Sequence, residues 1–175
     1  EQGSVRVLMR VISVVGWKNN GKTTLVVRLV EHLTREGLKV STVKHAHHSI
    51  DLDRPGKDTW RHREAGAAEV VLATSRRWIL MHELRDEAEP PLAELLAKLA
   101  PVDLVVVEGF KGTSLPKIEV HRGERGTDLI ARNDPDVVAV ASDVPLDGLA
   151  VPVIHLDDIE SVARTVLEHA REIER

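Results

Sequence analysis

The residues with the clearest chemistry in this chain lie together between positions 16 and 24. The run Gly16-Trp17-Lys18-Asn19-Asn20-Gly21-Lys22-Thr23 places two glycines, a lysine and a hydroxyl in the spacing G-x-x-x-x-G-K-[ST]. This spacing lets the backbone curl until successive N–H groups point into one concavity, which the oxygens of a diphosphate fill. We therefore expect a phosphate-binding loop (P-loop) with nucleotide contacts at Gly16, Lys18, Asn19, Asn20, Gly21, Lys22, Thr23 and Thr24.

A nucleoside triphosphate site also needs an acidic group close to Mg²⁺, and two carboxylates are candidates. Glu108 directly follows the apolar run 104–107, so it should stand at the carboxyl end of a buried strand. Asp53 lies in a block of mixed charge that extends to Arg63. Glu108 and Asp53 are expected as catalytic groups, and together with Thr23 as the Mg²⁺ ligands. The alternatives are a solvated carboxylate at a strand end and a solvated charged face.

A cluster of histidines follows the predicted strand at 38–43. Because ligands of open α/β sheets bind at the carboxyl ends of the strands, Lys44 and His45 are expected to border the phosphate site. The alternative is a zinc or nickel site formed by His45, His47 and His48 with His62, since imidazoles suit these metals.

The residues that would choose the base are less clearly marked. Guanine recognition commonly uses an Asn-Lys-x-Asp motif, which this sequence lacks. Asp143 follows the predicted strand 137–141 and occupies a comparable place, so we expect it to accept hydrogen bonds from guanine. The alternative is a turn aspartate before Pro145.

The elements that must position these residues alternate between strands and helices. Apolar runs predict strands at 11–15, 38–43, 104–107, 137–141 and 151–154. Helical spacing predicts helices from Lys22 to Gly37, over 92–99, and at the C-terminus with Asp157 as its cap and Ile173 on its buried side. The predicted fold class is α/β, a three-layer P-loop NTPase fold with a mainly parallel sheet and an added β-hairpin.

The added hairpin is predicted at 68–82, with its turn at 74–77. Because unpaired strand edges invite association, this hairpin is a candidate dimer element. The chain is expected to form a single domain over residues 1–175, with residues 1–5 disordered.

Composition excludes several classes of protein. The chain has 24 Lys and Arg against 28 Asp and Glu, a net charge of −4 and 2% aromatic residues, so no nucleic-acid partner is expected. It has no cysteine, which excludes disulfides and thiolate metal sites, and no apolar stretch long enough to span a bilayer. We expect a cytoplasmic protein without a membrane partner.

Several longer blocks carry a family resemblance. They are Val43-Lys44-His45-Ala46-His47-His48, the run from Asp51 to Ala67 with the pattern D-x-D-R-P-G-K-D-[ST], Val107-Glu108-Gly109-Phe110-Lys111 and Pro116-Lys117-Ile118-Glu119-Val120. With these blocks the chain resembles the molybdopterin-guanine dinucleotide biosynthesis adaptor family, MobB, over most of its length. One departure is Trp17-Lys18-Asn19-Asn20, where family loops more often carry small residues.

The resemblance implies a dimeric GTP-binding adaptor with Mg²⁺ and weak GTP hydrolysis. Its implied partner is the guanylyltransferase that converts molybdopterin to its guanine dinucleotide form, with molybdopterin itself as a further candidate ligand. Lys111 and Lys117 are expected to meet an anionic pterin or the enzyme that carries it. The alternatives are an autonomous P-loop GTPase in metal or cofactor delivery, and a small-molecule kinase.

Overall fold

The computed structural model describes residues 8–46 and 51–174. These residues group into two compact units: unit 1 contains the chain up to His45 and from Leu92 onward, and unit 2 is Ala46–Pro91. The expected disorder of residues 1–5 concerns positions outside the described residues, and a single domain over residues 1–175 stays a prediction.

Unit 1 is built on one seven-stranded sheet. Its strands are β1 (Leu8–Val15), β2 (Val40–Lys44), β5 (Leu104–Glu108), β6 (Lys117–His121), β7 (Val137–Ser142), β8 (Val153–His155) and β9 (Arg171–Glu174). Its helices are α1 (Lys22–Arg35), α3 (Leu92–Ala97) and α4 (Ile159–His169), with 3₁₀ turns η1 (Gly123–Arg125) and η2 (Ile130–Arg132). Every strand predicted from an apolar run is present, with ends shifted by a few residues.

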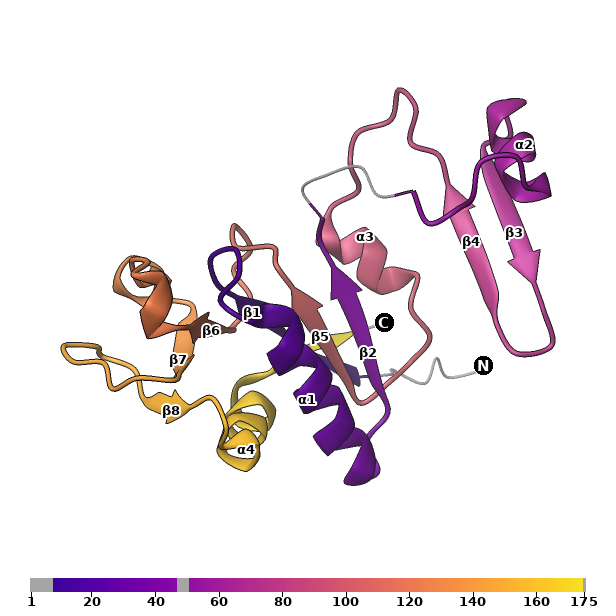
Figure 1. The fold of residues 1–175 in the computed structure, drawn as a ribbon. Coiled ribbons are helices and arrows are strands. Elements are labelled where there is room, and N and C mark those ends of the chain that lie inside the picture. The colour runs from indigo at the N-terminus through magenta and orange to yellow at the C-terminus, as the bar shows by residue number, and fades with distance from the viewer. Residues whose placement is uncertain (1–7, 47–50, 175) are drawn as a thin grey trace. The chain divides into compact units, whose positions relative to one another are not determined.

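The strands of the sheet are arranged so that their carboxyl ends share one edge. Six of them run parallel in the order β2-β5-β1-β6-β7-β8 (Figure 1). The seventh, β9, is antiparallel and pairs with the first half of β1, from Leu8 opposite Glu174 to Val11 opposite Arg171. On the same side, the second half of β1 pairs with β6, beginning at Ser13 opposite Lys117. The P-loop follows β1, a central strand of this sheet. It therefore lies where ligands of open α/β sheets bind, at the carboxyl ends of the strands.

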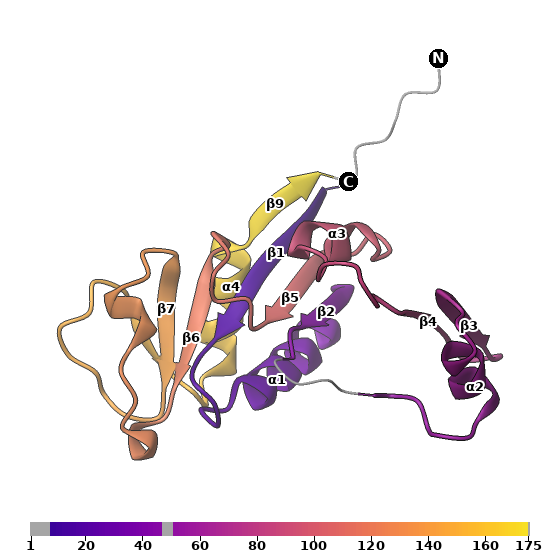
Figure 2. The ribbon, with the colours of Figure 1, turned by 90° about the horizontal axis from the view of Figure 1, so that it is seen from above.

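Helices cover both faces of this sheet (Figure 2). On one face, α1 and α4 pack on β1, β5, β6 and β7, and Leu29 and Val166 are fully buried there. On the other face, α3 packs through Leu92 and Leu96 against Val105 of β5. Successive strand residues point to opposite faces, so a strand buried on both faces reads as an unbroken apolar run. The predicted three-layer α/β fold with a mainly parallel sheet is confirmed.

The C-terminal helix differs from its prediction at both ends. The cap of α4 is Asp158, whose side chain accepts a hydrogen bond from the N–H of Ser161 (3.1 Å), so the prediction that Asp157 caps this helix is wrong. Asp157 instead forms an ion pair with Arg28 of α1 (3.2 Å). Ile173 was expected on the buried side of the helix, but it lies in β9, because the helix ends before the chain turns to pair with β1.

The strand β6 is buried although every second residue is polar, and the sequence did not predict it. Lys117 is 1% exposed, and its ammonium lies 2.9 Å from Asp134 and 3.5 Å from Asp136. It also donates a hydrogen bond to the carbonyl of Thr113. The prediction that Lys117 meets an anionic pterin or its carrier is therefore wrong, because its charge is satisfied inside unit 1.

The second buried charge of β6 is Glu119, which is also 1% exposed. Its two carboxylate oxygens accept hydrogen bonds from the N–H groups of Ile130 and Ala131, both at 2.8 Å. These are the first N–H groups of the 3₁₀ turn η2, which no residue of the turn itself can satisfy. Glu119 thus fixes η2 to the sheet.

Unit 2 contains helix α2 (Asp58–Glu64) and the strands β3 (Glu69–Ala73) and β4 (Trp78–His82). The two strands form the antiparallel hairpin that the sequence predicted at 68–82. This hairpin is a separate two-stranded sheet and does not extend the large one. Several of its large apolar side chains are exposed, namely Val71, Leu72, Trp78, Ile79 and Leu80.

Arg63 of α2 connects the acidic residues of unit 2. Its guanidinium lies 2.9 Å from Asp51, 3.3 Å from Asp53 and 2.5 Å from Glu83. The hydrogen bond from Arg63 holds the pKa of Asp51 below its usual value. Asp53 also accepts a hydrogen bond from the hydroxyl of Thr59 (2.9 Å). Ion pairs and hydrogen bonds thus connect the residues of the mixed-charge block, which is more than a solvated face.

Candidate phosphate-binding site

The two glycines of the P-loop are required by a close backbone approach at Gly16 and by a left-handed backbone at Gly21. A Cβ atom on Gly16 would lie 2.7 Å from the carbonyl oxygen of Val120 in β6, a distance that no side chain tolerates without a shift of the strand. Gly21 has a φ of +93°, in the left-handed region, and a Cβ there would lie 3.1 Å from Nε of Arg122. The loop therefore packs against β6 at Gly16 and against the side chain of Arg122, which follows β6, at Gly21.

Helix α1 begins directly after Gly21, and no side chain caps its first turn. Its first N–H groups have no partner within the helix and carry the positive end of the helix dipole. Lys22 curls back over the loop, and its ammonium donates hydrogen bonds to the carbonyls of Gly16 (2.9 Å) and Trp17 (3.1 Å). This arrangement provides N–H donors and one cation around the same turn, which suits a phosphate group.

Burial lowers the pKa of Lys22 from its ordinary value. The neighbouring ammonium groups of Lys111 and Lys44 lower it further, while the carboxylate of Glu108 raises it. The surroundings of Lys22 therefore contain more positive than negative charge, a balance that favours an anion at the loop.

Thr23 and Glu108 are in direct contact. The hydroxyl of Thr23 donates a hydrogen bond to Oε1 of Glu108 (2.7 Å), and Nζ of Lys44 lies 3.6 Å from the same oxygen. Parallel pairing explains this meeting, because the register sets Lys44 opposite Glu108 and Val14 opposite Glu108 across the two sides of β5. A hydroxyl and a carboxylate oxygen at this separation are a donor set that fits Mg²⁺, which prefers oxygen ligands and keeps several waters. Glu108 is buried here and is not a solvated strand-end carboxylate.

The remaining loop residues have distinct surroundings. Lys18 and Asn19 are exposed, and Asn19 has a φ of +65°, a conformation that asparagine tolerates. Asn20 is fully buried, and its side-chain oxygen accepts a hydrogen bond from the N–H of Arg122 (2.8 Å). The Asn20 side chain thus shapes the loop, and the phosphate contacts expected of these three residues stay predictions.

Trp17 stands where a small residue was expected from the family. It is 44% exposed, and its indole N–H donates to the carbonyl of Asp128 (2.7 Å). The ammonium of Lys111 lies over its ring, 3.8 Å from the ring centroid. The bulky residue is thus held on the outside of the loop by two contacts.

His45 borders the same edge of the sheet. Its N–H donates to the carbonyl of Glu108 (3.0 Å), and its ring lies 4.6 Å from the ring of Phe110. A Cβ on Gly109 would lie 3.3 Å from the Cβ of His45, so this glycine permits the close packing of the two loops. The structure therefore brings Lys44 and His45 to the carboxyl end of β5, beside the P-loop.

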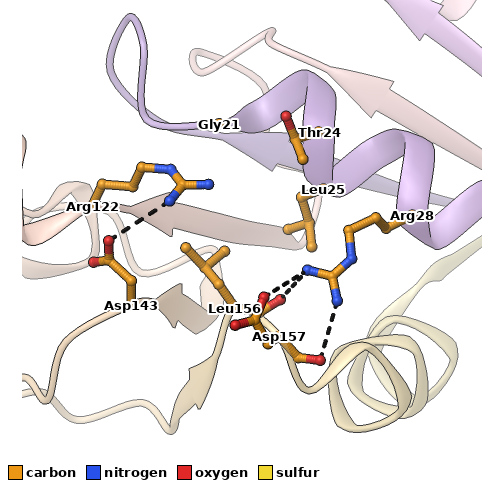
Figure 3. Close-up of a pocket in the computed structure, with 8 residues that line it drawn as sticks. All are labelled: Gly21, Thr24, Leu25, Arg28, Arg122, Asp143, Leu156 and Asp157. Atoms are coloured by element: carbon orange, nitrogen blue, oxygen red, sulfur yellow. Dashed lines mark hydrogen bonds and ion pairs between the residues drawn. The ribbon is translucent and has the colours of Figure 1, made fainter.

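A pocket adjoins the P-loop at the first turns of α1 (Figure 3). It is lined by Gly21, Thr24, Leu25, Arg28, Arg122, Asp143, Leu156 and Asp157. Asp143 accepts a hydrogen bond from the N–H of Gly123 (2.9 Å) and lies 3.7 Å from Arg122. On the other side, Arg28 donates to the carbonyl of Leu156 (2.9 Å) and to Asp157. The pocket thus presents two arginines and two carboxylates beside Thr24.

Arg122 and Arg28 were missed by reasoning from the sequence. Arg122 follows β6, and recognising that strand would have placed it at the carboxyl edge of the sheet. Arg28 lies one turn after Thr24, so helical spacing alone could have placed it beside the loop.

Asp53 and the histidines are distributed between the two units. Asp53 belongs to unit 2, where Arg63 and Thr59 engage its carboxylate, and its roles as catalytic group and Mg²⁺ ligand stay predictions. His62 also belongs to unit 2, and His47 and His48 lie outside the described residues. Within residues 8–46 and 51–174, no three His, Cys, Asp or Glu side chains gather closely enough to hold a metal ion.

The chain is similar to several known proteins. The family model described as molybdopterin guanine dinucleotide synthesis protein B matches residues 11–143. The molybdopterin-guanine dinucleotide biosynthesis adapter protein of Escherichia coli K12 is 39% identical over 168 residues, which cover 93% of this chain and 94% of the relative. The adapter protein of Haemophilus influenzae is 40% identical over 78% of this chain and 76% of its own length. In the part of the chain that the structure describes, no helix is long and apolar enough to cross a membrane.

Solved structures give the same result. The crystal structure of a MobB protein homolog from Bacillus stearothermophilus has a TM-score of 0.69 and 31% identity, covering 91% of this chain and 97% of that one. The structure of Bacillus subtilis MobB has a TM-score of 0.69 and 25% identity, covering 93% and 99%. The chain belongs to the molybdopterin-guanine dinucleotide synthesis protein B family, MobB.

Proposed function

We propose that this protein binds GTP and Mg²⁺ at its P-loop and acts in the cytoplasm as an adaptor for a molybdopterin guanylyltransferase. The observation that carries the nucleotide-binding part is the contact between Thr23 and Glu108 (2.7 Å) beside the Lys22 ammonium. Thr23 and Glu108 would hold Mg²⁺, directly or through water, and Lys22 would contact the terminal phosphates. The bound Mg²⁺ would neutralise phosphate charge.

GTP is proposed over ATP because of the pocket beside α1. A guanine base has N–H groups that can donate hydrogen bonds to a carboxylate. Asp143 lines this pocket together with Arg122. Asp143 is held in place by the N–H of Gly123 (2.9 Å), which leaves its second oxygen near Arg122. A fixed acceptor of this kind discriminates against a base that lacks the matching donors.

Titration calorimetry with GTP and ATP, with and without MgCl₂, tests this choice of base and metal. The wild-type protein should bind GTP more tightly than ATP and more tightly with Mg²⁺. The Asp143→Ala variant should lose about tenfold in GTP affinity and little in ATP affinity, since one hydrogen bond to a charged acceptor is removed. Asp147→Ala, in the following loop and outside the pocket, is the matched control. An unchanged ratio of GTP to ATP affinity in Asp143→Ala would rule out this role.

The adaptor role is supported by family membership and by the names of the relatives from Escherichia coli and Haemophilus influenzae. The assay is guanine dinucleotide formation by the guanylyltransferase encoded in the same genome, with and without this protein. Addition of the protein with GTP should raise the yield, while hydrolysis of GTP by the protein alone stays slow. A fast intrinsic hydrolysis rate, or phosphate transfer to an added small molecule, would instead support a GTPase or a kinase.

We further propose that the working form is a homodimer that uses the hairpin of unit 2. The exposed apolar side chains of β3 and β4, among them Trp78 at 69% and Val71 at 62%, support this proposal. An isolated two-stranded sheet is marginally stable, and pairing with a second copy would bury these side chains. Sedimentation velocity at micromolar concentration tests the proposal, and a purely monomeric boundary would contradict it.

A further inference from the structure

The turn after β5 directs Lys111 back toward the P-loop. Gly109 and Phe110 both have positive φ angles, +99° and +56°, which reverse the chain directly after the strand. The turn is anchored on β1, because the carbonyl of Gly109 accepts a hydrogen bond from the hydroxyl of Ser13 (2.7 Å) and its N–H donates to Val14 (3.0 Å). The backbone of Lys111 is therefore fixed beside the strand that leads into the P-loop.

The side chain of Lys111 rests on the P-loop itself. Its ammonium lies 3.8 Å from the centroid of the Trp17 ring, and Trp17 is the residue after Gly16. The ring is held from its other end by the hydrogen bond of its indole N–H to the carbonyl of Asp128 (2.7 Å). The indole thus holds a second lysine against the loop.

Lys111 and Lys22 influence each other electrostatically. Both ammonium groups contact Trp17: Lys22 donates to its carbonyl (3.1 Å) and Lys111 lies over its ring (3.8 Å), so the two like charges repel each other. Burial lowers the pKa of Lys111, while the carboxylate of Glu119 raises it. Two partly desolvated ammonium groups that repel each other are both stabilised when an anion is placed between them.

We propose that Lys111 is a second phosphate-binding lysine, which leaves the Trp17 ring and contacts the terminal phosphate of the bound nucleotide beside Lys22. This inference rests on the proposed nucleotide-binding function and deepens it. The four-carbon stem of lysine allows the ammonium to move without a change of backbone. At an exposed ring, a cation–π contact is weaker than a charge-assisted hydrogen bond to phosphate, so the exchange favours the nucleotide-bound state. The surroundings of the Trp17 ring would then differ between the empty and the nucleotide-bound site.

The first test is titration calorimetry of Lys111→Met with GTP, GDP and GMP in the presence of Mg²⁺. We expect GTP affinity to fall about tenfold, GDP affinity to fall less, and GMP affinity to stay unchanged, because only the terminal phosphates lose a contact. Lys111→Arg should recover most of the loss. Lys39→Met is the matched control, since Lys39 is an exposed lysine that precedes β2 at the opposite edge of the sheet.

The second test uses Trp17 fluorescence. Addition of GTP to the wild-type protein should change the emission, and Trp17→Phe identifies the part that comes from Trp17 and not from Trp60 or Trp78. The same addition to Lys111→Met, at saturating GTP, should give no change from Trp17. An equal change in both proteins would contradict the movement of Lys111.

The outcomes separate this inference from the proposed function. If the wild-type protein binds no nucleotide, both are overturned. If the wild-type protein binds GTP and Lys111→Met binds it equally well, only the inference about Lys111 is overturned. Equal losses for GTP, GDP and GMP would also overturn it, because they would indicate damage to the loop as a whole. Circular dichroism checks folding, and Lys111→Gln replaces Lys111→Met under the same criteria if that variant does not fold.

Discussion

The Lys22→Met variant is expected to bind GTP at least about 100-fold more weakly than the wild-type protein, because two charge-assisted contacts to phosphate are lost. Lys22 is the P-loop lysine, and its ammonium already lies over the turn, 2.9 Å from the carbonyl of Gly16. In the nucleotide complex the Lys22 ammonium would leave the carbonyls of Gly16 and Trp17 and donate to phosphate oxygens. Titration calorimetry at one fixed salt concentration measures the difference.

The same change should leave the folded state intact. Burial and the nearby charges of Lys111 and Lys44 lower the pKa of Lys22, so its ammonium is held in unfavourable surroundings. Removing that charge should leave the midpoint of thermal unfolding equal to that of the wild-type protein or slightly higher. A variant that binds GTP normally would refute the assignment of the P-loop, and a collapse in thermal stability would show that Lys22 is a structural residue.

The Glu119→Ala variant is expected to lose about 3 kcal/mol of unfolding free energy, since two buried N–H groups would lose their acceptor. Glu119 is 1% exposed and accepts from both Ile130 and Ala131 at 2.8 Å. For a chain of this size the midpoint of thermal unfolding should fall by roughly 6–12 °C. Denaturant titration followed by circular dichroism gives the change in free energy.

Two comparisons make this prediction specific. Glu124→Ala removes the same type of carboxylate from η1, where the side chain is 69% exposed and forms an ion pair with Arg125 (3.6 Å), so its effect should be within about 0.5 kcal/mol. Glu119→Gln keeps one acceptor oxygen, so its unfolding free energy should lie between those of Glu119→Ala and Glu124→Ala. Equal stabilities of Glu119→Ala and Glu124→Ala would show that η2 does not depend on the carboxylate.

The P-loop and the main strands could be predicted because their signals are local. Glycine spacing sets the loop, and strands buried on both faces require unbroken apolar runs. The meeting of Thr23 with Glu108 also follows from the sequence once β5 is placed beside β1, since Glu108 ends β5 and Thr23 follows the P-loop, which leaves the carboxyl end of β1. The position of Asp143 in the pocket at the first turns of α1 follows from the same reasoning, because Asp143 comes directly after β7.

Features that depend on contacts between distant segments could not be predicted. The strand β6 was missed because Lys117 and Glu119 interrupt its apolar pattern, and only the folded chain supplies their partners. Lys111 was expected to meet a pterin or an enzyme, and that role stays a prediction; its position over Trp17, which follows from the reversal of the backbone at Gly109, had no signal in the sequence. No sequence pattern predicts the left-handed φ of Phe110, the residue after this glycine.

The pairing of β9 with β1 has a practical consequence for handling the protein. Because β9 runs antiparallel, Glu174 lies opposite Leu8, at the end of β1 that is remote from the P-loop (Figure 2). The length of β1, roughly 25 Å at the usual rise of a strand, separates the two ends. A tether joined to the chain beyond β9 would therefore leave unit 1 at the end of β1 that is remote from the P-loop.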